Sequence, residues 1–167
     1  ELEVATLFAN GTKRKMWGLR INDATEEAEE LLIRVQERLP RSKLAEIAAL
    51  ELADLYYRTK KMKLANDMYL IFVENFPTSD HINKALSRLI YTRLATYRGP
   101  AFDNSGIMDA RRELVQLEFS HPQLAEEVES SALITRIDES LGQKMLSTAR
   151  WYAKTNNPIA AEYTVRR

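Results

Sequence analysis

A pattern of apolar residues that ends in proline occurs twice in this chain, and it constrains the fold more than any other feature. In each copy the apolar positions step i, i+3, i+4, i+7 and i+11, so they lie on one face of a helix. The closing prolines, Pro40 and Pro77, are 77 − 40 = 37 residues apart. A fixed period of this size is typical of helical repeat arrays, which usually bind or scaffold other molecules. The apolar positions are Ala28, Leu31, Leu32, Val35 and Leu39, then Ala65, Met68, Tyr69, Phe72 and Phe76.

The composition agrees with an all-helical protein. The chain has 167 residues, which is enough for a domain with a real core, and it contains only 5 glycines and 5 prolines. No apolar run approaches the roughly 18 residues that a membrane-spanning helix needs. The fold class we predict is therefore all-α.

Charge and cysteine content exclude several classes of protein. Lys+Arg and Asp+Glu both number 24, and this balance argues against a dedicated nucleic-acid binder, which usually carries a basic excess. The chain has no cysteine, so it holds no disulfide, no thiolate metal site and no cysteine nucleophile. We expect protein partners and no nucleic acid.

The residues that could carry chemistry are scattered. His81 and His121 are 40 residues apart and lack an acidic pair at ligand spacing, so we expect no metal site. Asp138 and Glu139 lie on a predicted helix without a partner for acid–base work, and we interpret them as solvated. There is no nucleophile elbow and no glycine-rich phosphate loop. We therefore predict no enzymatic activity and no cofactor.

The pattern divides the chain into one poorly assigned segment and a repeat domain. Residues 1–22 show no clear repeat, and we interpret the basic run Lys13 to Lys15 as solvated surface rather than a binding patch. Asp23 begins a helix as its N-cap, and Glu26 completes a capping box. The repeat domain covers residues 23–167, with units at about 23–40, 41–77, 78–122 and 123–167.

The second and third units each contain two predicted helices. Ser42 caps a helix that runs through Arg58, a turn follows at residues 60–63, and the next helix ends at Pro77. In the third unit Thr78, Ser79 or Asp80 caps a helix over about 80–98, and a second helix covers about 107–120. This unit is 122 − 77 = 45 residues long, and the extra residues fall in a loop at 98–106.

The fourth unit is expected to contain an unusually long helix. The helical pattern runs from Leu124 to about Thr155 without proline, which corresponds to roughly 45–50 Å if unbroken. Gly142 is the one expected weak point. Asn157 then caps a last helix with Pro158 at its first position.

The second unit resembles a tetratricopeptide repeat. Leu52 and Ala53 match its Leu–small pair, Tyr56 follows at the expected spacing, and three further signature positions follow in and directly after the next helix. The small residues lie where two helices approach closely. The resemblance implies a tetratricopeptide-like solenoid of helical hairpins with a right-handed superhelix. The three further positions are Ala65, Tyr69 and Pro77.

The C-terminal half resembles a narrower family. The stretch from Asp109 to Pro122, a long helix with Ala149-Arg-Trp-Tyr152, and Ala160-Ala161 occur in the order found in the outer-membrane assembly lipoprotein D family (BamD, also YfiO). The resemblance covers roughly residues 23–167. It implies a periplasmic lipoprotein tethered to the outer membrane, beside the machinery that receives unfolded outer-membrane proteins. This sequence contains no lipid-bearing cysteine, so we expect the anchor either to lie outside it or to be absent.

Partner-binding residues are expected on the face formed by the first helix of each hairpin. Tyr57 and Tyr91 offer aromatic faces to a peptide, and Arg58 and Lys84 offer charges to a carboxylate or carbonyl. Ordinary packing between repeats is the alternative interpretation. In the loop at 98–106, Phe102 either pins the loop or contacts a partner. The candidate residues are Leu50, Asp54, Tyr57, Arg58, Lys84, Tyr91 and Phe102.

Two functions remain open from the sequence. One is a protein-binding scaffold of the outer-membrane assembly type. The other is a generic tetratricopeptide adaptor or co-chaperone in another compartment. A signal peptide that ends before a cysteine, encoded upstream, favours the first function.

Overall fold

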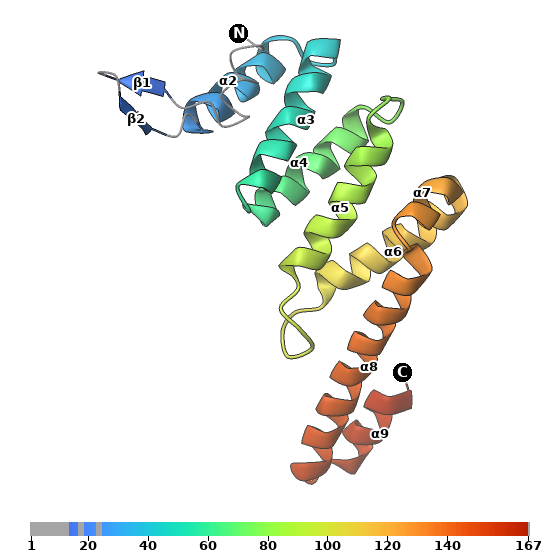
Figure 1. Cartoon of the computed structure of the whole chain (residues 1–167). Coiled ribbons are helices and arrows are strands. Elements are labelled where there is room, and N and C mark those ends of the chain that lie inside the picture. The colour runs from blue at the N-terminus through green and yellow to red at the C-terminus, as the bar shows by residue number, and fades with distance from the viewer. Residues whose placement is uncertain (1–13, 17–18, 23–24, 167) are drawn as a thin grey trace. The chain divides into compact units, whose positions relative to one another are not determined.

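The computed structural model describes residues 14–16, 19–22 and 25–166 of the chain (Figure 1). The fold is all-α, built from helical hairpins of the tetratricopeptide type, as predicted. The chain forms two compact units that divide between Ala95 and Thr96. From here on they are called the first and the second unit, and they are distinct from the four predicted repeats. The expected cap Asp23 lies outside the described residues.

A short antiparallel hairpin precedes the helices. Its strands are β1 (Arg14–Met16) and β2 (Leu19–Asn22), and Lys15 is the register partner of Arg20. The sequence pattern left this segment unassigned, because a strand of three or four residues is too short to show an alternating pattern.

The described residues of the first unit form four helices. They are α2 (Thr25–Arg38), α3 (Lys43–Arg58), α4 (Met62–Asn75) and α5 (Ile82–Thr96). Helix α3 packs on both α2 and α4. The predicted N-cap of α3 is confirmed, since the Ala45 N–H donates to Ser42 Oγ at 3.0 Å.

The contact between α3 and α4 follows the tetratricopeptide pattern. Ala53 and Ala65 are both fully buried, so the two helices approach closely where side chains are small. Tyr56 and Tyr69 are buried beside them and fill the remaining space. The Tyr56 hydroxyl donates to Glu29 Oε1 at 2.7 Å and so ties α3 to α2.

Helix α5 is shorter than the predicted helix over 80–98 because the residues before it form a turn. Ser79 Oγ accepts from the His81 N–H at 3.0 Å and donates to the buried Glu46 at 2.6 Å. This bond joins the turn to the first turn of α3. A second hydrogen bond joins α5 to α4: the Asn66 side-chain amide of α4 donates to Thr92 Oγ1 of α5 at 3.2 Å.

The second unit contains α6 (Ser105–Ser120), α7 (Pro122–Glu127), α8 (Ser130–Lys154) and α9 (Pro158–Arg166). The predicted unbroken helix from Leu124 to Thr155 is wrong. The chain breaks after Glu127, where Val128 is buried and Glu129 is left-handed, with φ 53° and ψ 47°. Helix α8 continues through Gly142 and is about 37 Å long.

Two local predictions for the second unit are confirmed. Asn157 Oδ1 accepts from the Ala160 N–H at 3.2 Å, so Asn157 caps α9 as expected. Helix α6 starts two residues before the predicted position and ends at Ser120 as predicted. Helix α8 packs against both α6 and α9.

Candidate functional site

Charged and aromatic side chains of α3, α4 and α5 meet in the first unit, and we call this group the α3–α5 surface. It consists of Asp54, Tyr57, Tyr69, Lys84 and Arg88. The Asp54 carboxylate accepts from the Tyr69 hydroxyl through one oxygen and from the Lys84 ammonium through the other. Its side chain is only 13% exposed, so the pair with Lys84 is partly shielded from water.

The aromatic part of this surface is covered by a cation. The Arg88 guanidinium carbon lies 4.1 Å from the centre of the Tyr57 ring, a cation–π contact. Tyr57 in turn meets Tyr69 edge to face at 6.5 Å between ring centres. Burial and the bond to Asp54 raise the pKa of Tyr69 above its ordinary value, so its hydroxyl stays a proton donor.

The structure brings three of the six candidates on α3 and α5 together: Asp54, Tyr57 and Lys84. Of the other three, Leu50 is 7% exposed and belongs to the hydrophobic core rather than to the surface. Arg58 is exposed at the last turn of α3, and Tyr91 is 39% exposed on α5.

Sequence reasoning missed Arg88. A signal for it was present, because Lys84, Arg88 and Tyr91 follow the i, i+4, i+7 spacing of one helix face. The cation lies on the aromatic ring that we expected a peptide to contact.

The predicted insertion is held against α8 in the second unit. Lys144 donates to the Phe102 carbonyl oxygen, and the Tyr97 and Ser140 hydroxyls are 2.8 Å apart. The Phe102 side chain itself is 53% exposed, so the loop is held through its backbone and through Tyr97. An open pocket of about 250 Å³ lies here, lined by Pro100, Ala101, Lys144, Ser147, Thr148 and Trp151.

One prediction about carboxylates is corrected. Asp138 was expected to be merely solvated, but Arg111 Nε and Nη2 reach its two oxygens at 2.6 and 3.0 Å. The bidentate bond lowers the pKa of Asp138 below its ordinary value. Asp138 therefore ties α8 to α6. Within the described ranges, no group of three His, Cys, Asp or Glu is arranged to hold a metal.

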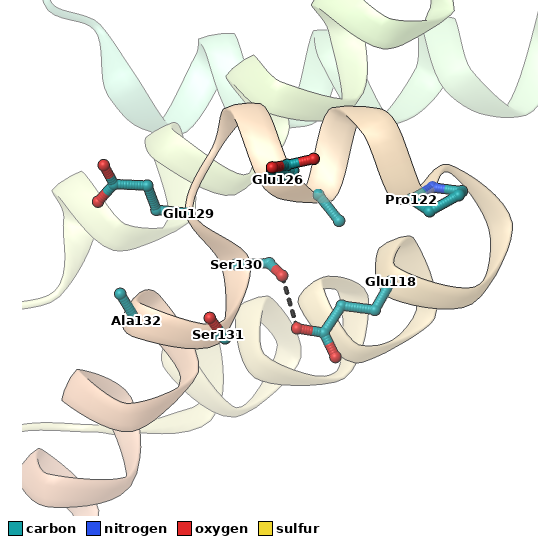
Figure 2. Close-up of a pocket in the computed structure, with 8 residues that line it drawn as sticks. Glu118, Pro122, Glu126, Glu129, Ser130, Ser131 and Ala132 are labelled. Atoms are coloured by element: carbon teal, nitrogen blue, oxygen red, sulfur yellow. Dashed lines mark hydrogen bonds between the residues drawn. The ribbon is translucent and has the colours of Figure 1, made fainter.

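A second open pocket lies where α6, α7 and α8 meet, and Figure 2 shows the side chains that line it. Its volume is about 460 Å³. Ser130 Oγ donates to Glu118 Oε1 at 2.6 Å across it. The lining residues are Glu118, Pro122, Ala125, Glu126, Glu129, Ser130, Ser131 and Ala132.

Comparison with known proteins places the chain in a family. The family model of YfiO, described as an outer membrane lipoprotein, matches residues 15–166 and so covers both units. No curated protein matches the chain. In the part of the chain that the structure describes, no helix has both the length and the apolar character that crossing a membrane requires. The chain therefore belongs to the YfiO family of outer membrane lipoproteins.

Proposed function

We propose that this protein is a non-catalytic, protein-binding scaffold in the periplasm, associated with the outer membrane and with the assembly of β-barrel proteins there. Membership of an outer membrane lipoprotein family supports the location. Helical hairpins stacked as α2–α5 support the binding role, because such arrays present extended surfaces to partners. In this proposal the protein reaches the membrane through a lipid anchor, as its family description implies.

The partner site that we propose in the first unit is the α3–α5 surface, with Tyr91 and Arg58 as exposed contacts beside it. The observation that carries it is a connected set of contacts: Asp54 accepts from both Lys84 and Tyr69, and Tyr57 packs between Tyr69 and the Arg88 guanidinium. Each of these groups is already paired within the protein, so the surface is ordered before a partner arrives. A preordered surface loses less side-chain entropy when it binds.

Binding there is noncovalent. Lys84 keeps a 46% exposed side chain while it pairs with Asp54, so its ammonium can also donate to a partner carbonyl or carboxylate. Tyr91 offers a ring to an apolar side chain, and Arg58 extends the positive edge. The proposed role of Leu50 is to hold α3 in place beneath these groups.

Phe102 is proposed as a separate contact in the second unit. Its side chain is more than half exposed although Lys144 and Tyr97 hold its loop in place. Aromatic side chains are enriched at protein interfaces, so an exposed phenylalanine on a loop held in place suits a partner contact. The two contacts lie in different units, so the experiment below tests the α3–α5 surface without altering Phe102.

Fluorescence anisotropy tests the α3–α5 surface. The probe is a labelled, unfolded segment of an outer-membrane β-barrel protein, titrated with the whole chain. Tyr91→Ala should weaken binding by about tenfold, equivalent to ~1.4 kcal/mol. The matched control is Tyr163→Ala, which removes a tyrosine that is 67% exposed on α9. Equal affinity of both variants and the unmodified protein would contradict the assignment.

A generic adaptor in another compartment is the second candidate function. Cell fractionation separates the two candidates when the full-length gene product is used. Recovery with the outer membrane supports the scaffold that we propose, and recovery only with cytosolic proteins supports the adaptor.

A further inference from the structure

We propose that the pocket between α6, α7 and α8 docks a segment of a partner protein in which arginine or lysine lies beside an apolar side chain. We call this surface the α6–α7 corner; it comprises the pocket lining and Phe119. It lies in the second unit and shares no residue with the α3–α5 surface. The two proposals can therefore fail independently.

The apolar part of the corner is unusually exposed. Phe119, in the last turn of α6, is 85% exposed, the largest value among the large apolar side chains of the described residues. Phe119 does not line the pocket itself, but it directly follows Glu118, which does. Pro122, Ala125 and Ala132 add apolar surface to the pocket. A partner that covers Phe119 removes its apolar surface from water and so gains affinity.

The negative charge of the α6–α7 corner favours a basic partner. Residues 113–135 contain five glutamates and no lysine or arginine. The rest of the chain then holds 24 basic residues against 24 − 5 = 19 acidic ones, so this segment is negative within a neutral protein. Three of the glutamates, Glu118, Glu126 and Glu129, line the pocket. A basic segment complements this surface, whereas nucleic acid and anionic lipid are repelled.

Local folding accounts for only one of these three carboxylates. Glu118 accepts from Ser130 at the start of α8, where a negative charge is favourable. Glu126 lies in the last turn of α7, where the helix dipole disfavours a negative charge. Glu129 has a left-handed backbone, which asparagine or glycine adopts at lower cost. Folding alone therefore does not explain why positions 126 and 129 carry glutamate, whereas binding of a basic partner does.

The geometry fits long cationic side chains. Glu118 lies on α6, Glu126 on α7 and Glu129 at the junction between α7 and α8, so a guanidinium in the pocket can be approached from several directions. Arginine pairs with carboxylates through two parallel hydrogen bonds, which adds direction as well as charge. A pocket of about 460 Å³ has room for such a side chain while a neighbouring apolar residue covers Phe119.

Anisotropy with a synthetic probe tests the proposal. The probe is a fluorescein-labelled peptide that carries four arginines and two leucines, titrated with the whole chain. The test variant is Glu126→Gln with Glu129→Asn, because asparagine tolerates the left-handed backbone. The control is Glu37→Gln with Glu74→Gln, which removes two exposed charges from the first unit. A second variant, Phe119→Ser, tests the apolar contact.

The corner variant should weaken peptide binding by about tenfold and the control by less than about twofold. Phe119→Ser should also weaken binding, and to a similar degree at low and high salt, because an apolar contact is not screened. Thermal melting followed by circular dichroism shows that each variant is folded. Equal losses for the corner and control variants, or no binding by the unmodified chain, would overturn the proposal.

Discussion

At the scale of single residues, small side chains determine how the helices pair. Ala53, Ala65, Tyr56 and Tyr69 could be predicted because their spacing is a property of the sequence alone, and all four are buried as expected. Arg88 could not be placed, because its contact is with a ring on another helix. The pairing of Asp54 with both Lys84 and Tyr69 was likewise absent from the sequence pattern, since three helices supply it.

Replacing Ala65 with leucine tests the close helix contact. Ala65 is fully buried between α3 and α4, so a larger side chain overpacks the contact and should cost about 1–3 kcal/mol of unfolding free energy. Urea unfolding measures this loss. Lys63→Leu places the same residue at an exposed position of α4 and should cost little. A variant at position 65 with unchanged stability would show that the helix pairing is wrong.

Acid should weaken the contact between Ser79 and Glu46. The hydrogen bond from Ser79 lowers the pKa of Glu46 below its ordinary value of 4.5. A lowered pKa in the folded state means that the ionised carboxylate stabilises the fold. This contribution is fully present above pH 4.5 and is lost as the pH falls through the lowered value.

The measurement for this contact is urea unfolding of Ser79→Ala at neutral and acidic pH. The substitution should cost about 1–3 kcal/mol near neutral pH, because it leaves the buried Glu46 carboxylate without this donor, and less in acid. Ser147→Ala, which alters an exposed serine bonded only within α8, serves as the control. A loss that is the same at both pH values would contradict this account.

At the scale of elements, helix starts and ends were predicted well where a cap or a proline sets them. Ser42, Asn157 and Pro158 are examples. The break between α7 and α8 was missed because no glycine or proline marks it. It depends on tertiary contacts instead, since Val128 turns into the core and Ser130 reaches Glu118. Gly142, the expected weak point, lies inside a regular helix.

Gly142→Ala should stabilise the protein. A Cβ at this position meets no atom within 4 Å, and glycine inside a helix costs about 1 kcal/mol relative to alanine. We expect a gain of about 0.5–1 kcal/mol in urea unfolding. Gly99→Ala is the matched control with the opposite sign, because the φ angle of 109° at Gly99 strains any side chain. Destabilisation by Gly142→Ala would mean that the glycine is needed for a bend.

At the scale of the whole molecule, the fold class and family could be predicted because they rest on recurring spacings along the chain. The all-α hairpin fold and the YfiO family are both confirmed. The candidate sites could be predicted only in part. Sequence patterns placed Tyr57 and Tyr91 on helices that the structure contains, and their role in binding stays a prediction. The position of Arg88 on Tyr57 and the carboxylates around the α6–α7 corner depend on how separate helices fold together.

The central claim is that this protein binds other proteins at the outer membrane. The most direct test is affinity purification of the full-length gene product from native membranes, followed by mass spectrometry, with Tyr91→Ala purified in parallel. The account predicts that barrel-assembly components or unfolded outer-membrane proteins are recovered with the unmodified protein, and that Tyr91→Ala recovers less of at least one of them. Recovery of only soluble cytosolic proteins would contradict the claim.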